Sequence, residues 1–429
     1  MSYLIPLLFL VACGPSSTGD SGDTGSPQDT ADTASTTDWS QATDEEVIRA
    51  LIDGTGPALQ SALHQVAWNG GFPVHTGQDT WLFVVESDGQ SAWSLAGDFD
   101  GWTPEAMTQA DGFFWAEKSI ASPAGQPYKF THDTTWVADR WARSYEYDTN
   151  GQISFVKPPT DRPRIDRWPD LQGQGLLPRD LRVLVPAGTG PWPVLYAQDG
   201  QNLFDPNAIW GGWHLQDAVA ALDAPILVVG IDSTANRLDE YAPTVDEIDA
   251  GGSQPLVAGG EADAYAALVE QDIRPHIEAV YGSTGLDGVL GSSMGGLVSL
   301  YIALQYPNDF DFAASMSGTL GWGRFGDSNP TVEEDYVAAG IQPFTIYVDS
   351  GGDDGGDGCT DPDLDGFPED DPNDSDNYCM TRHFADAMAT LGYVYDDNLF
   401  HWWEQGATHD EVHWAARVGR PLGIFDAMR

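Results

Sequence analysis

A serine flanked by glycines is the strongest chemical signal in the chain. The segment Gly291-Ser292-Ser293-Met294-Gly295 contains the pattern G-x-S-x-G, and only Ser293 has a glycine both two positions before it and two positions after it. The apolar run 288–291 has the length of a short strand, and residues 297–306 have helical periodicity. A serine on such a sharp strand-to-helix turn is lifted above the sheet, beside the N–H groups of the helix N-terminus. The pattern predicts Ser293 as a nucleophile, with the N–H of Met294 as an oxyanion donor.

A serine nucleophile needs a general base, and in a strand–turn–helix setting of this kind the base is a histidine late in the chain. His409 ends the small-residue stretch 406–409, just after an apolar run that ends at Trp403. A loop beyond the carboxyl end of a strand is where the base belongs, so we predict His409. The other histidines after Ser293 are weaker candidates, because one lies inside the apolar run and two in predicted helices: His401, His413 and His383.

The base in turn needs an orienting carboxylate, which we expect just after the predicted strand 344–348. Asp349 directly continues that strand and is expected to shape the turn. Asp354 lies beyond Gly351-Gly352, on a loop that can curl toward the histidine, and is the predicted acid. Asp353 is the alternative.

The elements that must position these residues fall into two predicted folded regions. From about residue 165 to 429, apolar runs of strand length alternate with helical segments, which predicts a mainly parallel sheet covered by helices. From about 47 to 160, short aromatic runs alternate with Gly, Asp and Pro turns, which predicts a small all-β sandwich after a short helix at 51–66. The Pro-rich stretch 157–163 is the expected linker.

The first region resembles the early-set immunoglobulin-like domains that precede glycogen-branching enzymes, enterochelin esterases and many bacterial carbohydrate esterases. The resemblance covers about residues 80–155 and rests on the segments 95–102, 127–130 and 136–139. It implies that exposed aromatic residues such as Trp102 and Trp136 stack on sugar or aryl rings. The alternative is that both side chains are core or interface residues.

The second region resembles the putative-esterase branch of the α/β-hydrolases, which includes esterase D, enterochelin esterase and feruloyl or acetyl-xylan esterases. The matching segments are 195–205 (LYAQDGQNLFD), 230–232, 237–243 (RLDEYAP), 272–281, 291–296 and 315–317, together with His409 followed five residues later by Trp414. The resemblance implies an α/β-hydrolase fold and the N–H of Gln201 as the second oxyanion donor. It also implies Arg237, Glu240 and Asn202 as pocket residues, the first two alternatively as a buried ion pair. The family's acid comes three residues after the glycine that ends its strand, which again gives Asp354, although an unusual insertion follows.

The N-terminus predicts export. The apolar run 4–12 is too short to span a bilayer and has the size of a secretory core segment. It ends in Leu10-Val11-Ala12-Cys13, which resembles the bacterial lipoprotein box and implies a lipid on Cys13, although no Lys or Arg precedes the run. Residues 14–46 are rich in Ser, Thr, Gly, Asp and Pro and predict a disordered acidic tether. We therefore expect a bacterial membrane-anchored lipoprotein, periplasmic or at the cell surface.

An acidic insertion covers about residues 353–379. It holds eleven carboxylates between residues 353 and 376 and no basic residue there, and Cys359 and Cys379 bracket most of it. In an exported protein these two cysteines are expected to form a disulfide. The regular Asp spacing resembles the short Asp-rich calcium repeats of secreted bacterial proteins, and the alternative is a solvated acidic loop. The resemblance predicts structural Ca²⁺ held by these carboxylates: Asp361, Asp363, Asp365, Asp371 and Asp374.

Composition limits the possible partners. The 429 residues carry 66 Asp and Glu against 18 Lys and Arg, a formal charge of −48, which argues against binding nucleic acid or docking on anionic lipid by charge. Contact with a membrane is expected through the lipid anchor only. The predicted function is a lipid-anchored serine esterase that removes feruloyl or acetyl groups from carbohydrate. The substrate is expected to be either a small molecule or a polysaccharide, and no cofactor is expected for catalysis. The alternatives are an enterochelin-type siderophore esterase and a non-catalytic carbohydrate-binding lipoprotein.

Overall fold

The computed structural model describes residues 37–248, 255–352, 359–361 and 376–429. Within these ranges, none of the helices combines the length and apolar character that crossing a bilayer requires. The predicted signal segment 1–13 and most of the predicted tether 14–46 lie outside the described residues.

The N-terminal part, up to the linker, is built mainly of short strands. It contains, in order, η1 (Trp39–Gln41), α1 (Asp44–Ile52), α2 (Leu59–Trp68), β1 (Val74–Gly77), β2 (Thr80–Glu86), β3 (Ser94–Gly97), η2 (Asp98–Asp100), β4 (Glu105–Ala106), β5 (Thr108–Gln109), β6 (Phe113–Ser119), β7 (Pro127–His132), β8 (Thr135–Val137), β9 (Ser144–Asp148) and β10 (Gly151–Phe155).

The remainder alternates strands with helices. It contains β11 (Arg164–Leu171), β12 (Arg179–Val185), β13 (Trp192–Gln198), η3 (Gly200–Asn202), η4 (Ile209–Gly211), α3 (Leu215–Ala220), β14 (Leu227–Ile231), α4 (Arg237–Tyr241), β15 (Val245–Ile248), β16 (Leu256–Gly259), α5 (Ala262–Ala267), the π-helix η5 (Leu268–Ile273), α6 (Arg274–Tyr281), β17 (Ser283–Ser292), α7 (Met294–Gln305), β18 (Phe312–Met316), α8 (Val332–Ala339), β19 (Thr345–Ser350), α9 (Tyr378–Leu391), β20 (Leu399–Trp403), α10 (Glu411–Arg417) and α11 (Gly419–Ala427).

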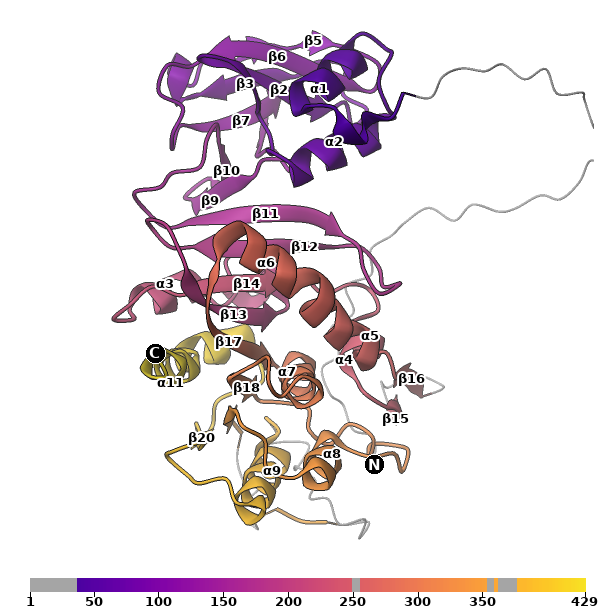
Figure 1. The fold of residues 1–429 in the computed structure, drawn as a ribbon, viewed down its shortest axis with the longest axis vertical. Coiled ribbons are helices and arrows are strands. Elements are labelled where there is room, and N and C mark those ends of the chain that lie inside the picture. Colours follow the sequence, from indigo (N-terminus) through magenta and orange to yellow (C-terminus); the bar gives the residue numbers. More distant parts are fainter. Residues whose placement is uncertain (1–36, 249–254, 353–358, 362–375) are drawn as a thin grey trace, which may run out of the picture.

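A long mixed sheet forms the centre of the molecule (Figure 1). Its order is β20-β19-β18-β17-β13-β14-β12-β11, in which β14, β13 and β17 to β20 are parallel and β12 and β11 are antiparallel to their neighbours. Helices cover both faces, so this is the mainly parallel, α/β-hydrolase-like fold predicted from the sequence. Because the parallel strands run the same way, their carboxyl ends meet at one edge of the sheet.

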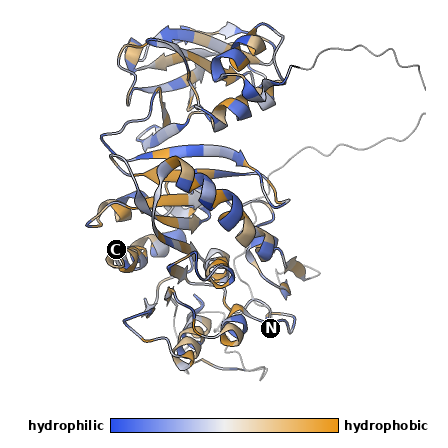
Figure 2. Cartoon of the chain, viewed as in Figure 1, coloured by the Kyte–Doolittle hydropathy of each residue, from blue (hydrophilic) through white to orange (hydrophobic). Residues whose placement is uncertain are grey.

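Alternate residues of the central strands pack into two separate cores. On β13, Val194 and Tyr196 join the core under α5 to α9, whereas Leu195 and Ala197 join the core under α3, α10 and α11. Burial on both faces explains why these strands are continuous apolar runs rather than alternating ones. In Figure 2 the strands in the middle of the sheet carry much of the orange that marks hydrophobic residues.

The N-terminal part is a small β-sandwich, as predicted. The antiparallel sheet β1-β2-β6-β5 packs through Phe83 and Phe114 against Tyr128 and Phe130 of β7. The outer face of that sheet is covered by α1 and α2. Pairing of β9 with β11 connects the sandwich strands to the central sheet, so one sheet continues across the predicted linker.

The helix predicted at 51–66 is wrong in its bounds, because two helices occur there. Gly54 adopts φ of 69°, a left-handed conformation that ends α1. A Cβ on Gly56 would lie 2.6 Å from the backbone nitrogen of Leu51, so the chain folds back on the end of α1 before α2 begins. Thr43 and Glu46 form a capping box that fixes the start of α1.

Candidate active site

Ser293 lies on the sharp turn that its sequence pattern predicts. It connects β17 to α7 with φ of 55° and ψ of −126°, a strained conformation for a residue with a side chain. A Cβ on Gly291 would lie 2.2 Å from the carbonyl oxygen of Gly295, and a Cβ on Gly296 would lie 2.5 Å from Oγ of Ser315. The turn therefore requires glycine at these positions. The hydroxyl of Ser293 lies 3.4 Å from Oγ1 of Thr319.

His409 contacts a carboxylate that the sequence reasoning did not select. Its Nδ1 lies 2.5 Å from Oδ1 of Asp376, whose side chain is fully buried. Trp414 packs edge-on against the imidazole, with ring centroids 5.0 Å apart, and fixes the plane of the ring. The second carboxylate oxygen of Asp376 accepts hydrogen bonds from Oγ of Ser317 at 2.7 Å and from the N–H of Gly351 at 2.6 Å.

The carboxylate that bonds to His409 is Asp376, whereas the predicted acid was Asp354. Asp353 and Asp354 lie outside the described residues, and the Nδ1 position that Asp354 was predicted to occupy is taken by Asp376. Counting forward from Gly351 did not select Asp376, because Asp376 follows Gly351 by 25 residues and directly precedes Asn377, the N-cap of α9. The available signal was position: Asp376 is the last carboxylate before Cys379.

A short segment after β18 connects the serine to the His–Asp pair. The N–H of Ser293 donates to the carbonyl of Met316 at 2.9 Å, and the N–H of Thr319 donates to the carbonyl of Ser293 at 3.2 Å. Between them, Ser317 donates its hydroxyl to Asp376. Ser293, Asp376 and His409 are thus joined at the carboxyl edge of the sheet through residues 316–319.

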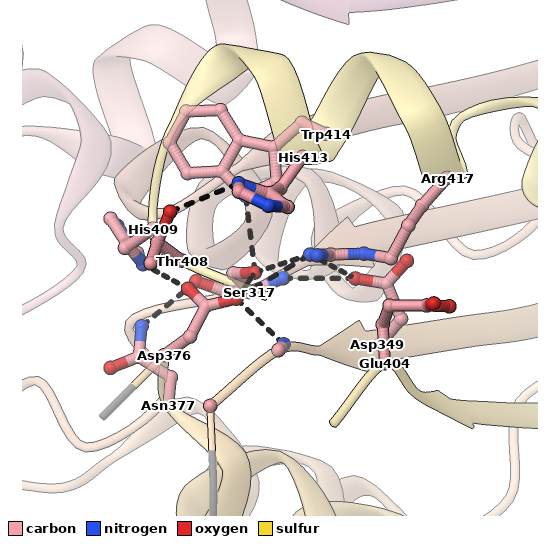
Figure 3. A network of polar contacts seen from close by, with 12 residues as sticks. Ser317, Asp349, Asp376, Asn377, Glu404, Thr408, His409, His413, Trp414 and Arg417 are labelled. Carbon is pink, nitrogen blue, oxygen red and sulfur yellow. Dashed lines mark hydrogen bonds and ion pairs between the residues drawn. The ribbon is translucent and has the colours of Figure 1, made fainter. Parts of the chain in front are cut away.

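The surroundings of Asp376 form a buried polar network (Figure 3). Arg417 donates to Asp349 at 3.1 Å and lies 3.5 Å from Asp376, so one guanidinium serves two carboxylates. Burial raises the pKa of Asp349, and the charge of Arg417 acts against that rise. Asp349 also accepts from the hydroxyl of Tyr347 at 2.7 Å. Asp349 lies within β19 rather than in the turn after it, its carboxylate also accepts from the N–H of Ser317 at 3.3 Å, and the carboxylate that contacts His409 is Asp376.

The remaining histidine candidates have other partners. His401 lies on β20, where burial lowers its pKa to about 4 and keeps the ring neutral. His383 lies on α9, 2.8 Å from Glu333, and His413 lies on α10, 3.0 Å from Asp410. His413 also lies 2.9 Å from the hydroxyl of Thr408, the residue before His409.

The predicted oxyanion donors lie on neighbouring elements of the same edge. Met294 is the first residue of α7, so its N–H has no acceptor within the helix. Gln201 lies in η3, just after β13, the strand that pairs with β17. Its side-chain amide is fixed by two bonds to Ser233, of 2.8 and 3.0 Å. A Cβ on Gly295 would lie 3.0 Å from Oδ2 of Asp199, so the start of η3 packs directly against the start of α7.

The predicted pocket residues are separated by the structure. The alternative ion pair between Arg237 and Glu240 is wrong, because each side chain has another partner. Arg237 binds Asp199 through two bonds of 2.7 and 2.8 Å, which holds the residue that begins the η3 turn. Glu240 is fully buried and pairs at 2.9 Å with Arg179, so it does not line a pocket.

Asn202, the third predicted pocket residue, donates its amide to Oε1 of Glu411 at 3.2 Å. Glu411 was not singled out by sequence reasoning. It is 5% exposed, and burial raises its pKa to about 7.

Cys359 and Cys379 form the predicted disulfide. Of the five predicted calcium ligands only Asp361 belongs to the described residues, and Asp363, Asp365, Asp371 and Asp374 lie outside them. The described ranges contain no cluster of three or more His, Cys, Asp or Glu side chains suited to a metal ion. The calcium site stays a prediction.

The two predicted ring-binding residues of the sandwich lie together. Trp102 and Trp136 have ring centroids 6.1 Å apart, and Trp136 is 43% exposed. Neither belongs to the buried cores of the sandwich, so the prediction that they are core residues is wrong for this pair.

Comparison with known proteins agrees with this fold. Residues 172–421 match the family model described as putative esterase. The chain is 33% identical over 135 residues to the uncharacterized protein YbbA of Bacillus subtilis, which covers 30% of this chain and 51% of that protein. It is 28% identical over 138 residues to the siderophore triacetylfusarinine C esterase of Aspergillus fumigatus, which covers 32% of this chain and 47% of that protein. The chain thus spans about half the length of the curated relatives it matches.

Among solved structures, the enterobactin esterase FES of Shigella flexneri is similar over 82% of this chain and 94% of that chain, with 15% identity and a TM-score of 0.41. The siderophore hydrolase EstA of Aspergillus nidulans is similar over 62% of this chain and 93% of that chain, with 17% identity and a TM-score of 0.44.

Proposed function

We propose that this chain, which belongs to the putative esterase family, is a serine esterase with Ser293 as nucleophile, His409 as general base and Asp376 as the orienting acid. The observation that carries the proposal is the contact between Asp376 and His409, joined through residues 316–319 to a serine held on a strained turn. A catalytic serine needs this order of groups: a hydroxyl, an imidazole to take its proton, and a carboxylate that fixes the imidazole.

The reaction proceeds in two halves. Nε2 of His409 takes the hydroxyl proton as Oγ of Ser293 attacks the ester carbonyl carbon, and the C=O π electrons move onto the oxygen. The tetrahedral intermediate collapses, the bond to the alcohol oxygen breaks, and His409 returns the proton to that oxygen. Water, activated by the same imidazole, then attacks the acyl-serine and releases the acid and free Ser293.

Two features lower the barrier in this scheme. The N–H groups of Met294 and Gln201 stabilise the oxyanion, and one such donor is typically worth about 3 kcal/mol in the transition state. Asp376 accepts from Nδ1 and so leaves Nε2 free to receive the serine proton. It also stabilises the imidazolium that forms.

For the substrate we propose an iron-chelating small molecule closed by ester bonds, of the siderophore class. The support is the partial match to a siderophore triacetylfusarinine C esterase. The net negative charge of the chain argues against one kind of siderophore, because a ferric tris-catecholate is strongly anionic and would be repelled by this protein. A ferric tris-hydroxamate is neutral, so a hydroxamate triester fits better.

Acyl esters of carbohydrate are the second candidate, and the Trp102–Trp136 pair favours them. Two indole rings at the surface of the sandwich, one of them well exposed, form an aromatic surface on which a sugar or a feruloyl ring can stack. A ring-binding surface away from the serine suits a polymeric substrate better than a small chelator.

We further propose that the protein is exported and anchored by lipid on Cys13. The apolar run followed by Cys13 supports this, and the Cys359–Cys379 disulfide suits an oxidising compartment. Incorporation of a labelled fatty acid into the wild-type chain, and its loss in Cys13→Ser, would test the anchor.

Turnover of p-nitrophenyl acetate tests the enzyme assignment. We expect Ser293→Ala to lower kcat by about 10⁶-fold, the size typical of losing a triad member. If the wild type and the variant both leave the ester to hydrolyse at its spontaneous rate, the chain is a non-catalytic binding protein instead. Product analysis with a hydroxamate triester, enterobactin, feruloylated xylan and acetylated xylan then decides the substrate. Cleavage of xylan esters alone, lost in a Trp102→Ala, Trp136→Ala double variant, would overturn the siderophore proposal.

A further inference from the structure

Glu411 is a buried carboxyl at the candidate active site that the proposed mechanism does not use. It follows His409 by two residues, begins α10, and is 5% exposed. Its Oε1 accepts the hydrogen bond from Asn202, and its Oε2 is buried without a hydrogen-bond partner among the described residues. A buried carboxyl with an unsatisfied oxygen costs free energy, so such a group is retained for a reason other than stability alone.

The partner of Glu411 is fixed from the other side of the site. The N–H of Asn202 donates to the carbonyl of Asp199 at 2.9 Å, and the carbonyl of Asn202 accepts from the N–H of Trp213 at 2.9 Å. The backbone of Asn202 is therefore held at both ends, and its side chain is the part that reaches across to Glu411. Asn202 also directly follows Gln201, the predicted second oxyanion donor.

We propose that Glu411 is a positioning residue for ester hydrolysis: by accepting the hydrogen bond of Asn202 it holds the η3 segment, with the N–H of Gln201, at a fixed distance from the loop that carries His409. The two segments are 209 residues apart in the chain, and this bond joins them directly. The inference rests on the proposed function, since it assigns a role in the same reaction.

The charge of Glu411 adds a second, separable effect. The charged groups around it are Asp199 at the end of β13, Arg237 of α4, and His409 and Asp410 in the loop before α10. Of the helices packed against α10, η4 has no titratable side chain, and α11 has Arg420, stacked on Trp402, and Asp426, paired with Arg429. An ionised Glu411 favours the imidazolium of His409 and opposes charge on the oxyanion, whereas a neutral Glu411 does neither.

Glu411→Gln and Glu411→Ala separate positioning from charge. Glutamine keeps an oxygen that accepts from Asn202, whereas alanine removes it. We expect Glu411→Ala to lower kcat by about tenfold to a hundredfold with KM changed by less than about threefold. The reason is that the bond from Asn202 to Glu411, which this variant loses, holds the oxyanion donor that acts in the transition state. Glu411→Gln should recover most of that loss and shift the acidic limb of the kcat/KM profile toward lower pH, a shift that a merely structural role would not produce.

Two further variants keep the test decisive. Asn202→Ala removes the donor of the same bond and should lower kcat as much as we expect for Glu411→Ala. It therefore tests the proposal even if Glu411→Ala fails to fold. Glu404→Gln, which removes an exposed carboxylate after β20, should leave the pH profile in place.

The outcomes distinguish the two claims. Loss of hydrolysis in Ser293→Ala, with wild-type kcat in both Glu411→Ala and Asn202→Ala, would overturn the role of Glu411 and leave the proposed function intact. Hydrolysis that does not depend on Ser293 would overturn the proposed function itself. A Glu411→Gln variant as impaired as Glu411→Ala would contradict positioning by hydrogen bond.

Discussion

The carboxylate of Asp376 bonds to Nδ1 of His409 at 2.5 Å, from a position just ahead of a cysteine that is itself in a disulfide. In sequence, Asp376 belongs to the end of the acidic insertion rather than to the turn after β19. Asp349, which sequence reasoning placed at that turn, lies within β19 and pairs with Arg417. The candidate triad therefore takes its acid from the residue three positions before Cys379, which the disulfide joins to Cys359.

Replacing the acid gives the first prediction. We expect Asp376→Asn to lower kcat by about 10⁴-fold, because an amide no longer stabilises the imidazolium or the productive tautomer of His409. The fold should persist, since the amide oxygen still accepts from Ser317 and Gly351. Stopped or steady-state kinetics with p-nitrophenyl acetate measure the loss, and far-UV circular dichroism checks the fold.

Asp354→Asn is the matched control, because Asp354 was the acid predicted by spacing. It should keep kcat within about twofold of the wild type, because in the proposed mechanism the carboxylate that fixes His409 is Asp376. A large loss in Asp354→Asn combined with a small one in Asp376→Asn would show that the acid is Asp354 after all.

The difference between these two residues shows what the sequence could predict. Ser293 and His409 were predicted because their signals are local: glycines at fixed offsets around one, and a small-residue loop after a strand for the other. Steric contacts explain the first signal directly, since a Cβ at position 291 would lie 2.2 Å from the carbonyl oxygen of Gly295, and a Cβ at position 295 would lie 3.0 Å from Oδ2 of Asp199. The parallel sheet was predictable for a similar reason, because burial on both faces leaves continuous apolar runs.

The residues that sequence reasoning missed depend on contacts between segments distant in the chain. Asp376 meets His409 only because the insertion returns to the sheet edge. Arg237 and Glu240 look like a pair at i and i+3, yet each is neutralised by an element distant in sequence, Asp199 and Arg179. Glu411 depends on Asn202 in the same way. No local spacing carries that information.

Breaking the disulfide gives the second prediction. A crosslink across 20 residues contributes about 3 kcal/mol on the chain-entropy model, so Cys359→Ser with Cys379→Ser should lower Tm by several degrees. We also expect a lower kcat, because Asp376 loses the constraint that brings it to His409. Calorimetry and ester kinetics on the same sample measure both.

Reduction of the wild type with dithiothreitol should have the same two effects, and reoxidation should reverse them. The double serine variant should not respond to the reductant at all. Full activity in the double variant would show that the contacts of Asp376 with Ser317 and Gly351 suffice to hold the acid.

The pH dependence of stability gives the third prediction. Burial raises the pKa of Glu411 to about 7, above the value near 4.5 of the unfolded chain. The folded state therefore binds the proton of Glu411 more tightly than the unfolded state does. This preference adds its whole contribution to the free energy of unfolding below about pH 4.5, and the contribution is lost as the pH rises through about 7. By linkage this loss is about 3 kcal/mol as an upper value.

Glu411→Gln removes this titration. Its free energy of unfolding, from urea denaturation at pH 5 and pH 8, should fall less between the two values than that of the wild type. Glu404→Gln serves as the control for removal of an exposed carboxylate. Parallel curves for Glu411→Gln and the wild type would mean that Glu411 titrates normally in the folded protein.

Removal of calcium gives the last prediction, which concerns Asp361, Asp363, Asp365, Asp371 and Asp374. Their repulsion is unfavourable unless a cation or solvent offsets it, and Asp374 comes two residues before Asp376, which contacts His409. If Ca²⁺ binds the folded chain, a concentration a hundred times Kd stabilises it by about 2.7 kcal/mol. A chelator should then lower both Tm and kcat, and Ca²⁺ should restore them where Mg²⁺ at the same concentration does not, because the larger ion accepts more carboxylate oxygens. An Asp363→Asn, Asp365→Asn double variant should already show the low Tm and no response to the chelator. If Tm and kcat of the wild type are unchanged by the chelator, the calcium prediction is wrong and the alternative of a solvated acidic loop stands.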